Sequence, residues 1–243
     1  MAEAALEVTG MTAGYVPDLP ILRDVSMRAE TGRVTVIIGP NGAGKSTLIK
    51  AVAGLVPVSE GTVHLGARAI TGIRPDQLSA HGMAYVPQSD NIFRSLTIAE
   101  NLDLALARAA GGAQMRERLL QQFPVLADKL KEKAGALSGG QRQFLAVAMA
   151  LAAEPSVILM DEPSAGLAPK AAQEVLEEAR ALTERGVTIV LVEQNVNQAL
   201  RLADHCYILA EGRNQIDGAA ADLLGDPVVA EIYLGGKRLR AGG

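Results

Sequence analysis

"GPNGAGKST", residues 39–47, decides how the rest of the chain is interpreted. The stretch matches G-x-x-x-x-G-K-[ST], and it lies between the strand-like run "RVTVII" and the helix-like run "TLIKAVAG". In such a loop the glycines let the backbone curl so that its N–H groups point inward, and the following helix adds its positive end. We expect Lys45 to reach the terminal phosphates of a nucleoside triphosphate and Ser46 to hold Mg²⁺. The predicted contacts of this phosphate loop are Gly39, Pro40, Asn41, Gly42, Ala43, Gly44, Lys45, Ser46 and Thr47.

A second stretch, "VILMDEP" at residues 157–163, has four apolar residues typical of a buried strand, followed by two acids. Asp161 fits a contact to Mg²⁺ through water, and Glu162 fits the group that orients or deprotonates an attacking water. Together with the phosphate loop this pattern indicates phosphoryl chemistry. It leaves several classes open, including small-molecule kinases and GTPases.

A third stretch, "LSGGQRQ" at residues 137–143, narrows the choice. Ser138 and two adjacent glycines precede a long helix-like run, which predicts a second helix N-terminus that attracts anions. The phosphate loop is already complete without it. The stretch therefore suggests a contact with the nucleotide of a second molecule.

Strand-like and helix-like runs divide the chain into an α/β core and an insert. Predicted strands are Leu6–Val8, Val25–Ala29, Arg33–Ile38 and Thr62–Leu65, and then Val157–Met160, Val187–Val192 and Cys206–Leu209. From Thr97 to Pro155 the pattern is helical almost throughout, and "TIAE" has the spacing of a capping box. The only linker-like stretch there is "AAGGA", residues 109–113. We therefore expect a helical insert over 89–155 between two core segments, 1–88 and 156–243.

With these stretches, the chain resembles the ATP-binding subunit of an ABC transporter over nearly its whole length. The resemblance implies one α/β domain of the P-loop NTPase fold, with a mixed sheet, flanking helices and a small N-terminal antiparallel β part. It also implies ATP and Mg²⁺ as cofactors, and a partner's ATP as the contact of Ser138, Gly139, Gly140 and Gln141. ATP held by two subunits would close the pair, and hydrolysis would reopen it.

The resemblance carries over to further single residues. Tyr15, in "AGYVPD", matches the aromatic residue that stacks on adenine, and Gln88, in "AYVPQS", matches the glutamine that couples Mg²⁺ and the attacking water to the membrane partner. Lys45, Gln88 and Glu162 then form the expected catalytic group, together with Gln194. The implied Mg²⁺ contacts are Ser46, Gln88 and Asp161.

The stretch "LVEQNVNQAL", residues 191–200, departs from the family pattern because Gln194 stands where most members carry a histidine that senses the γ-phosphate. A glutamine donates and accepts hydrogen bonds, but it does not become cationic near pH 7 as histidine does. None of His64, His81 and His205 lies at a suitable position. Our hypothesis is that Gln194 faces the γ-phosphate when two subunits close, while Glu162 is the main catalytic carboxylate.

Three stretches resemble the subfamily that powers branched-chain amino acid import: "IFRSLTIAENL" (92–102), "PSAGLAP" (163–169) and "LVEQN". Ala168 replaces the aspartate of most other family members. The resemblance implies permease subunits as partners, with Asn91–Leu102 as docking surface, a second ATP-binding subunit, preferably a different chain, and an indirect binding protein. ATPases for urea, amides, other amino acids or lipids, and soluble ABC ATPases without a transport role, remain alternatives.

Composition excludes other classes. The net charge of −4 and 3% aromatic residues argue against nucleic-acid binding. The longest apolar run, 144–153, is about half the ~20 residues that cross a bilayer, and the N-terminus lacks the basic character of an export signal. The single cysteine, Cys206, fits a reducing compartment. We therefore expect a peripheral protein at the cytoplasmic face of the membrane, with "KRLR" (237–240) as a solvated tail.

Overall fold

The computed structural model describes residues 3–107 and 111–233, and within them the strands form two sheets. The central sheet has the order β10-β9-β3-β8-β7-β6, and the smaller sheet has the order β2-β1-β4-β5. The central strands are β3 (Val34–Ile38), β6 (Met83–Val86), β7 (Val157–Asp161), β8 (Thr188–Val192), β9 (His205–Ala210) and β10 (Arg213–Ala219). The others are β1 (Ala4–Ala13), β2 (Leu22–Glu30), β4 (Val58–Leu65) and β5 (Arg68–Ala69).

The central sheet is parallel except at one edge, where β10 pairs antiparallel with β9. Every residue of β3, β7 and β8 is buried, as expected for parallel strands covered on both faces, and this explains their continuous apolar runs. The carboxyl ends of these neighbouring strands meet at one edge of the sheet, where ligand sites of α/β proteins form. The predicted phosphate loop and Glu162 both follow such strand ends.

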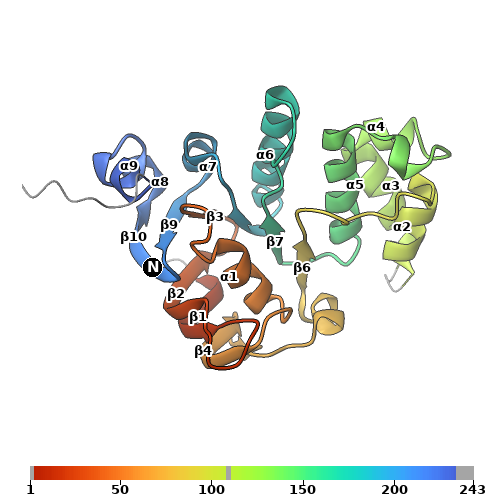
Figure 1. Cartoon of the computed structure of the whole chain (residues 1–243). Helices are drawn as coiled ribbons and strands as arrows, with labels where there is room; N and C mark the ends of the chain where they lie inside the picture. Colours follow the sequence, from red (N-terminus) through yellow and green to blue (C-terminus); the bar gives the residue numbers. More distant parts are fainter. Residues whose placement is uncertain (1–2, 108–110, 234–243) are drawn as a thin grey trace, which may run out of the picture.

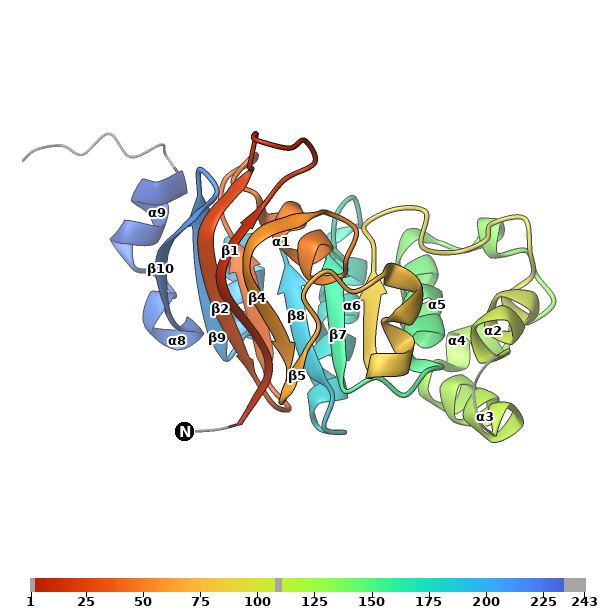
Figure 2. The ribbon, with the colours of Figure 1, turned by 90° about the horizontal axis from the view of Figure 1, so that it is seen from below.

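The smaller sheet is antiparallel and confirms the predicted N-terminal β part. Helix α1 (Lys45–Val52) contacts β1 on one side and β7 and β8 on the other, so it joins the two sheets through one apolar cluster. Figure 2 shows β1, β2 and β4 side by side as a curved layer beside the central strands. This packing fixes α1, and with it the loop that precedes the helix.

The helical part lies to one side of the sheet, beyond β6 (Figure 1). It contains α2 (Ile98–Leu106), α3 (Gly112–Gln122), α4 (Pro124–Ala127) and α5 (Gly139–Leu151). Thr97 and Glu100 form the predicted capping box of α2: the Thr97 N–H donates to Glu100 Oε2 at 2.6 Å, and the Glu100 N–H donates to Thr97 Oγ1 at 3.1 Å. The prediction of nearly continuous helix is wrong between α4 and α5, where the described chain has only a 3₁₀ turn, Ala134–Ala136.

The remaining helices are α6 (Pro169–Thr183), α7 (Val196–Leu202), α8 (Ala220–Leu223) and α9 (Pro227–Tyr233), and two 3₁₀ turns, Pro75–Gln77 and Ser79–His81, precede β6. The predicted strands lie in the observed ones, but β10 was missed because "RNQIDGA" is mostly polar at the sheet edge. In "AAGGA", residues 109 and 110 lie outside the described residues, and Gly112 begins α3. The "KRLR" prediction also falls outside them.

In the two described ranges, every helix is too short or too polar to span a bilayer.

Candidate nucleotide-binding site

The phosphate loop runs from the end of β3 to the start of α1. It contains two glycines in backbone conformations that other residues rarely adopt. Gly39 has φ 152° and Gly44 has φ 95°. A Cβ on Gly39 would lie 2.1 Å from the Leu209 carbonyl oxygen, and a Cβ on Gly44 would lie 2.7 Å from Leu22 Cδ2. The loop therefore requires glycine at both ends, which explains why the sequence motif is so restrictive.

Lys45, the first residue of α1, is only 5% exposed. Its Nζ donates to the carbonyl oxygens of Gly39 at 2.9 Å and Pro40 at 3.2 Å. Burial lowers the pKa of Lys45, and the carboxylates of Glu162 and Asp161 oppose this shift. The loop residues 41–47, Ile21 and Glu162 line a cavity of about 240 Å³. Lys45 thus brings a buried ammonium group to a cavity lined by the phosphate loop.

Asp161, the last residue of β7, is 2% exposed and held on one side only. Its Oδ2 accepts from the Tyr85 hydroxyl at 3.3 Å and lies 3.7 Å from Lys50 Nζ. Its Oδ1 is buried and has no hydrogen-bond partner among the described residues. A buried carboxylate oxygen without a donor is costly, and a hydrated cation at this point would satisfy it. Asp161 therefore fits the predicted Mg²⁺ contact.

Glu162 is the point where the predicted catalytic residues meet. Its Oε2 accepts from Gln88 Nε2 at 2.9 Å and from Gln194 Nε2 at 2.6 Å. The residue has φ 48°, its N–H donates to the Val192 carbonyl at 3.0 Å, and it is 6% exposed. Two amides that donate to one carboxylate oxygen fix the orientation of this carboxylate. Since β6, β7 and β8 are neighbours, the residues that follow them converge here.

Glu193, Gln194 and Asn195 each form hydrogen bonds with a different part of the chain. Glu193 is 2% exposed, and its carboxylate accepts from Ser164 N at 3.1 Å, Ser164 Oγ at 2.8 Å and Gln194 N at 3.3 Å. Burial raises the pKa of Glu193, although these hydrogen bonds oppose the shift. Asn195 caps α7, since its side chain accepts from the Gln198 N–H at 3.2 Å.

Two polar residues of the site were not predicted from the sequence. Glu193 tethers the loop after Glu162, and the signal for it was a carboxylate directly after the apolar run 189–192. Gln143, on α5, is 6% exposed; its Nε2 donates to the Pro163 carbonyl at 2.9 Å, and its Oε1 accepts from Asn91. Its signal was a glutamine on the buried face of a helix.

The structure does not bring Ser138–Gln141 or Tyr15 to the phosphate-loop cavity. Ser138 caps α5 through a capping box with Gln141, and Gly139 lines a different cavity of about 160 Å³ together with Gln88. Tyr15 is 54% exposed and does not line the phosphate-loop cavity. These residues are available to a second molecule or a base, respectively. They are not part of the cluster around Glu162.

The histidines lie elsewhere: His64 is in β4, His81 ends a 3₁₀ turn, and His205 pairs with Asp217 at 3.2 Å. In the part of the chain that the structure describes, no three His, Cys, Asp or Glu side chains gather as a metal-ion cluster. The candidate Mg²⁺ contacts thus include only one carboxylate, that of Asp161. This is usual where nucleotide phosphates supply further oxygen ligands.

The site combines a glycine-rich phosphate loop, a buried lysine and a carboxylate that accepts two amide hydrogen bonds, all at the ends of parallel strands. This combination defines a P-loop ATPase that hydrolyses nucleotide. The family model "ABC transporter" matches residues 22–165, more than half of the chain, and the protein belongs to this family. It is an ATP-hydrolysing transporter subunit, and subunits of this family dimerise and work with transmembrane permease subunits.

The chain is 40% identical over 234 residues to the "Probable branched-chain amino acid transport ATP-binding protein LivF" of Archaeoglobus fulgidus, covering 95% of this chain and 98% of that protein. It is 38% identical to the "High-affinity branched-chain amino acid transport ATP-binding protein BraG" of Pseudomonas aeruginosa, covering 91% and 96%. The structure resembles the ADP conformation of MJ1267, an ATP-binding cassette of an ABC transporter, with TM-score 0.86 and 30% identity, over 96% and 100% of the two chains.

Proposed function

We propose that the protein is the ATP-binding subunit that powers import of branched-chain amino acids. The similarity to LivF and BraG over more than nine-tenths of the chain supports the cargo class. The cluster in which Gln88 and Gln194 both donate to Glu162, beside the phosphate loop, is the observation that carries the catalytic part. Cargo selection itself would lie in the membrane and binding-protein partners.

The chain's own residues divide the work of hydrolysis between them. The Lys45 ammonium group leaves the loop carbonyl oxygens and binds the terminal phosphates, while backbone N–H groups of residues 41–47 hold the remaining oxygens. Ser46, Asp161 and Gln88 would hold Mg²⁺, which neutralises phosphate charge when bound. Glu162 accepts a proton from the attacking water, and its two amide donors orient its carboxylate.

The contacts between two subunits belong to the same proposal. Ser138–Gln141 would cap the ATP of a partner subunit, and Tyr15 would stack on adenine, since both lie away from the phosphate-loop cavity and Tyr15 is exposed. ATP then closes the pair and hydrolysis reopens it. The preferred pair is this chain with a related but different ATPase. Ala168, the N-cap of α6, makes no side-chain cap, so this loop would rely on its backbone at the interface.

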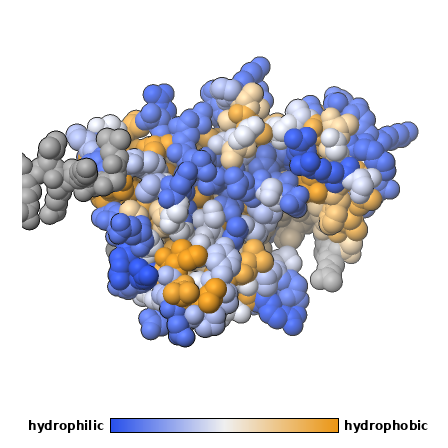
Figure 3. Space-filling view, in the orientation of Figure 1, coloured by the Kyte–Doolittle hydropathy of each residue, from blue (hydrophilic) through white to orange (hydrophobic). Residues whose placement is uncertain are grey.

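We propose further that residues 89–155 act as the helical insert and that the groove beside it receives a permease helix. A cavity of about 830 Å³ lies between the turns that precede β6 and helices α2 and α5. Figure 3 shows this hollow between the core and the helical part, with hydrophobic surface on the helical side. Its rim carries the exposed apolar side chains of Leu55 and Leu104, and Phe93 is exposed in the predicted docking segment Asn91–Leu102.

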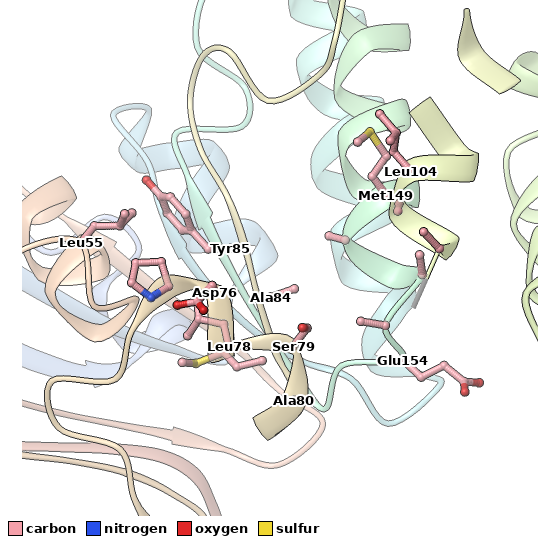
Figure 4. A pocket seen from close by; sticks show the side chains of 17 residues that line it. Leu55, Asp76, Leu78, Ser79, Ala80, Ala84, Tyr85, Leu104, Met149 and Glu154 are labelled. Carbon is pink, nitrogen blue, oxygen red and sulfur yellow. The ribbon is translucent and has the colours of Figure 1, made fainter. Parts of the chain in front are cut away.

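The groove also reaches the catalytic site. Figure 4 shows Leu104 and Met149 on the helices at one side of it, and Leu55 and Tyr85 on the other. The Tyr85 hydroxyl donates to Asp161 at 3.3 Å. A permease helix bound in the groove would therefore contact a side chain that is hydrogen-bonded to the candidate Mg²⁺ contact. A peripheral position at the cytoplasmic face of the membrane follows from such docking.

Transport by the assembled complex tests the proposal. The tagged chain is purified with its companions from gently solubilised membranes and reconstituted in vesicles with ATP inside, together with the binding protein. ATP-dependent uptake of labelled leucine, isoleucine and valine, absent with Glu162→Gln, is the expected result. Uptake of only urea, amides or lipids would assign another cargo, and ATPase activity without any membrane companion would contradict a transport role.

A further inference from the structure

The phosphate loop has an attachment that its sequence motif does not contain. The N–H of Gly39 donates to the hydroxyl oxygen of Tyr233 at 2.6 Å, across 194 residues of sequence. The Gly39 carbonyl oxygen accepts from Lys45 Nζ at 2.9 Å. The first residue of the loop is therefore held from both sides, by a phenol at its N–H and by an ammonium group at its C=O.

Tyr233 is well placed to be a fixed acceptor. It ends α9, which lies with α8 at the β9–β10 end of the central sheet (Figure 1). With Ile232 it packs, half-buried, against the larger apolar cluster of the core. Burial raises the pKa of Tyr233 to about 12, so its hydroxyl stays neutral at physiological pH. The C-terminal helix thus presents a neutral oxygen to the point where β3 leaves the sheet.

The two attachments of Gly39 differ in what nucleotide binding does to them. Lys45 Nζ must leave the Gly39 and Pro40 carbonyl oxygens to reach a phosphate. The Tyr233 bond lies on the other side of Gly39 and needs no change. Gly39 keeps φ 152° with a neighbouring carbonyl, that of Leu209, so close that a Cβ would lie 2.1 Å from it. Because Gly39 has so little space in this strained conformation, we expect it to need a hydrogen bond that persists when Lys45 moves.

We propose that Tyr233 is a positioning residue for the phosphate loop: its hydroxyl holds the Gly39 N–H, so that the loop keeps its nucleotide-binding conformation when Lys45 turns to the phosphates. The inference rests on the proposed role of Lys45. Loss of the hydroxyl leaves a loop that spends part of its time in other conformations. The apparent dissociation constant for nucleotide then rises by the inverse of the competent fraction, while turnover of bound ATP changes little.

Tyr233→Phe removes only the hydroxyl, and Tyr207→Phe is the matched control. Tyr207 is another tyrosine whose hydroxyl accepts a backbone N–H, that of Arg28 at 2.9 Å, but Arg28 lies in β2 and not in the phosphate loop. Dissociation constants for ATP and ADP are measured by titration calorimetry on the full chain with Mg²⁺, and kcat and KM on the assembled transporter. One hydrogen bond corresponds to a factor of about five. We expect that rise in Kd and KM for Tyr233→Phe, kcat within about twofold, and Kd of Tyr207→Phe within about twofold of the parent.

The outcomes separate this inference from the function on which it rests. Equal nucleotide affinity of Tyr233→Phe and the parent overturns it, and so does an equal loss of affinity in Tyr207→Phe. A fall in kcat with unchanged KM would also contradict a positioning role before chemistry. Lys45→Ala is the third variant: if it binds ATP normally, the proposed phosphate site itself fails. If it loses ATP while Tyr233→Phe does not, only the role of Tyr233 fails.

Discussion

Glu193 offers a sharp test of how the site is held together, because it contacts the loop after Glu162 without reaching the phosphate-loop cavity. Its carboxylate accepts from two donors of Ser164 and from the Gln194 N–H. Glu193→Ala would leave the N–H and the hydroxyl group of buried Ser164 without this acceptor. Each unsatisfied donor costs about 1–3 kcal/mol, so for the two donors we expect a loss of about 2–6 kcal/mol of unfolding free energy at pH 7.

Glu193→Gln separates the hydrogen bonds from the charge. The amide oxygen still accepts from Ser164, whereas the buried negative charge is gone, so we expect this variant to lose less than about 1 kcal/mol. The pH dependence follows from the pKa of Glu193, which burial raises above its unfolded value. The ionised form is therefore disfavoured in the folded state. Glu193 lowers stability above its folded-state pKa, and this cost disappears as pH falls through that pKa toward the unfolded value.

Urea unfolding of the purified chain, followed from pH 5 to pH 8, measures both effects. The parent should gain stability relative to Glu193→Gln as pH falls, and the difference should be flat at the alkaline end. Midpoints are compared only where the m-values agree. A loss below about 0.5 kcal/mol in Glu193→Ala, or a parent that loses stability relative to Glu193→Gln on acidification, would refute this account of the tether.

Three further predictions concern activity. Gln194→Ala removes one of the two amide donors to Glu162, so ATP turnover of the assembled transporter should fall about fivefold, while the exposed control Gln173→Ala should leave it unchanged. Unchanged turnover in Gln194→Ala would show that Gln194 is an ordinary surface residue without a role in hydrolysis. Glu162→Gln should lower turnover by a factor of about 10²–10⁴ with ATP binding retained, as calorimetry can check, and residual turnover near the parent level would exclude Glu162 as the base. Leu104→Ser should weaken copurification of the permease without changing ATP affinity, whereas Leu224→Ser, equally apolar and exposed but away from the groove, should not; equal effects of the two would argue against the groove as docking site.

The backbone course of the phosphate loop was predictable because the motif places its glycines and lysine within nine residues. Gly39 and Gly44 occupy backbone conformations that favour glycine, and Lys45 opens the next helix, so the motif carries its own geometry. The capping boxes at Thr97 and Ser138 are local in the same way; the first was predicted as such, and the second only as a helix N-terminus. The capping boxes depend on neighbours three residues away, and a single sequence contains them.

The cluster around Glu162 was predictable only as a set of parts. Glu162 was assigned from the strand-end pattern, and Gln88 and Gln194 through the family resemblance, but their meeting at one carboxylate oxygen depends on the order β6-β7-β8. The Tyr233 contact and the Glu193 tether depend on packing between distant segments. No periodicity or spacing in a single sequence reports such contacts, because both partners look like ordinary residues of their own elements.

The glutamine at 194 can satisfy both the observed contact and the hypothesis that it faces the γ-phosphate. A primary amide carries two N–H donors, and one of them goes to Glu162 Oε2 in the structure. The second hydrogen points in another direction and is sufficient for one phosphate oxygen. A neutral histidine at this position has an N–H on one ring nitrogen only and gains the second when it is protonated near neutral pH, whereas the amide keeps the same donors at every physiological pH. A Gln194→His variant should therefore introduce a pH dependence of turnover between about pH 6 and 8 that the parent lacks, and parallel pH profiles of the two would show that residue 194 does not contact the reacting groups.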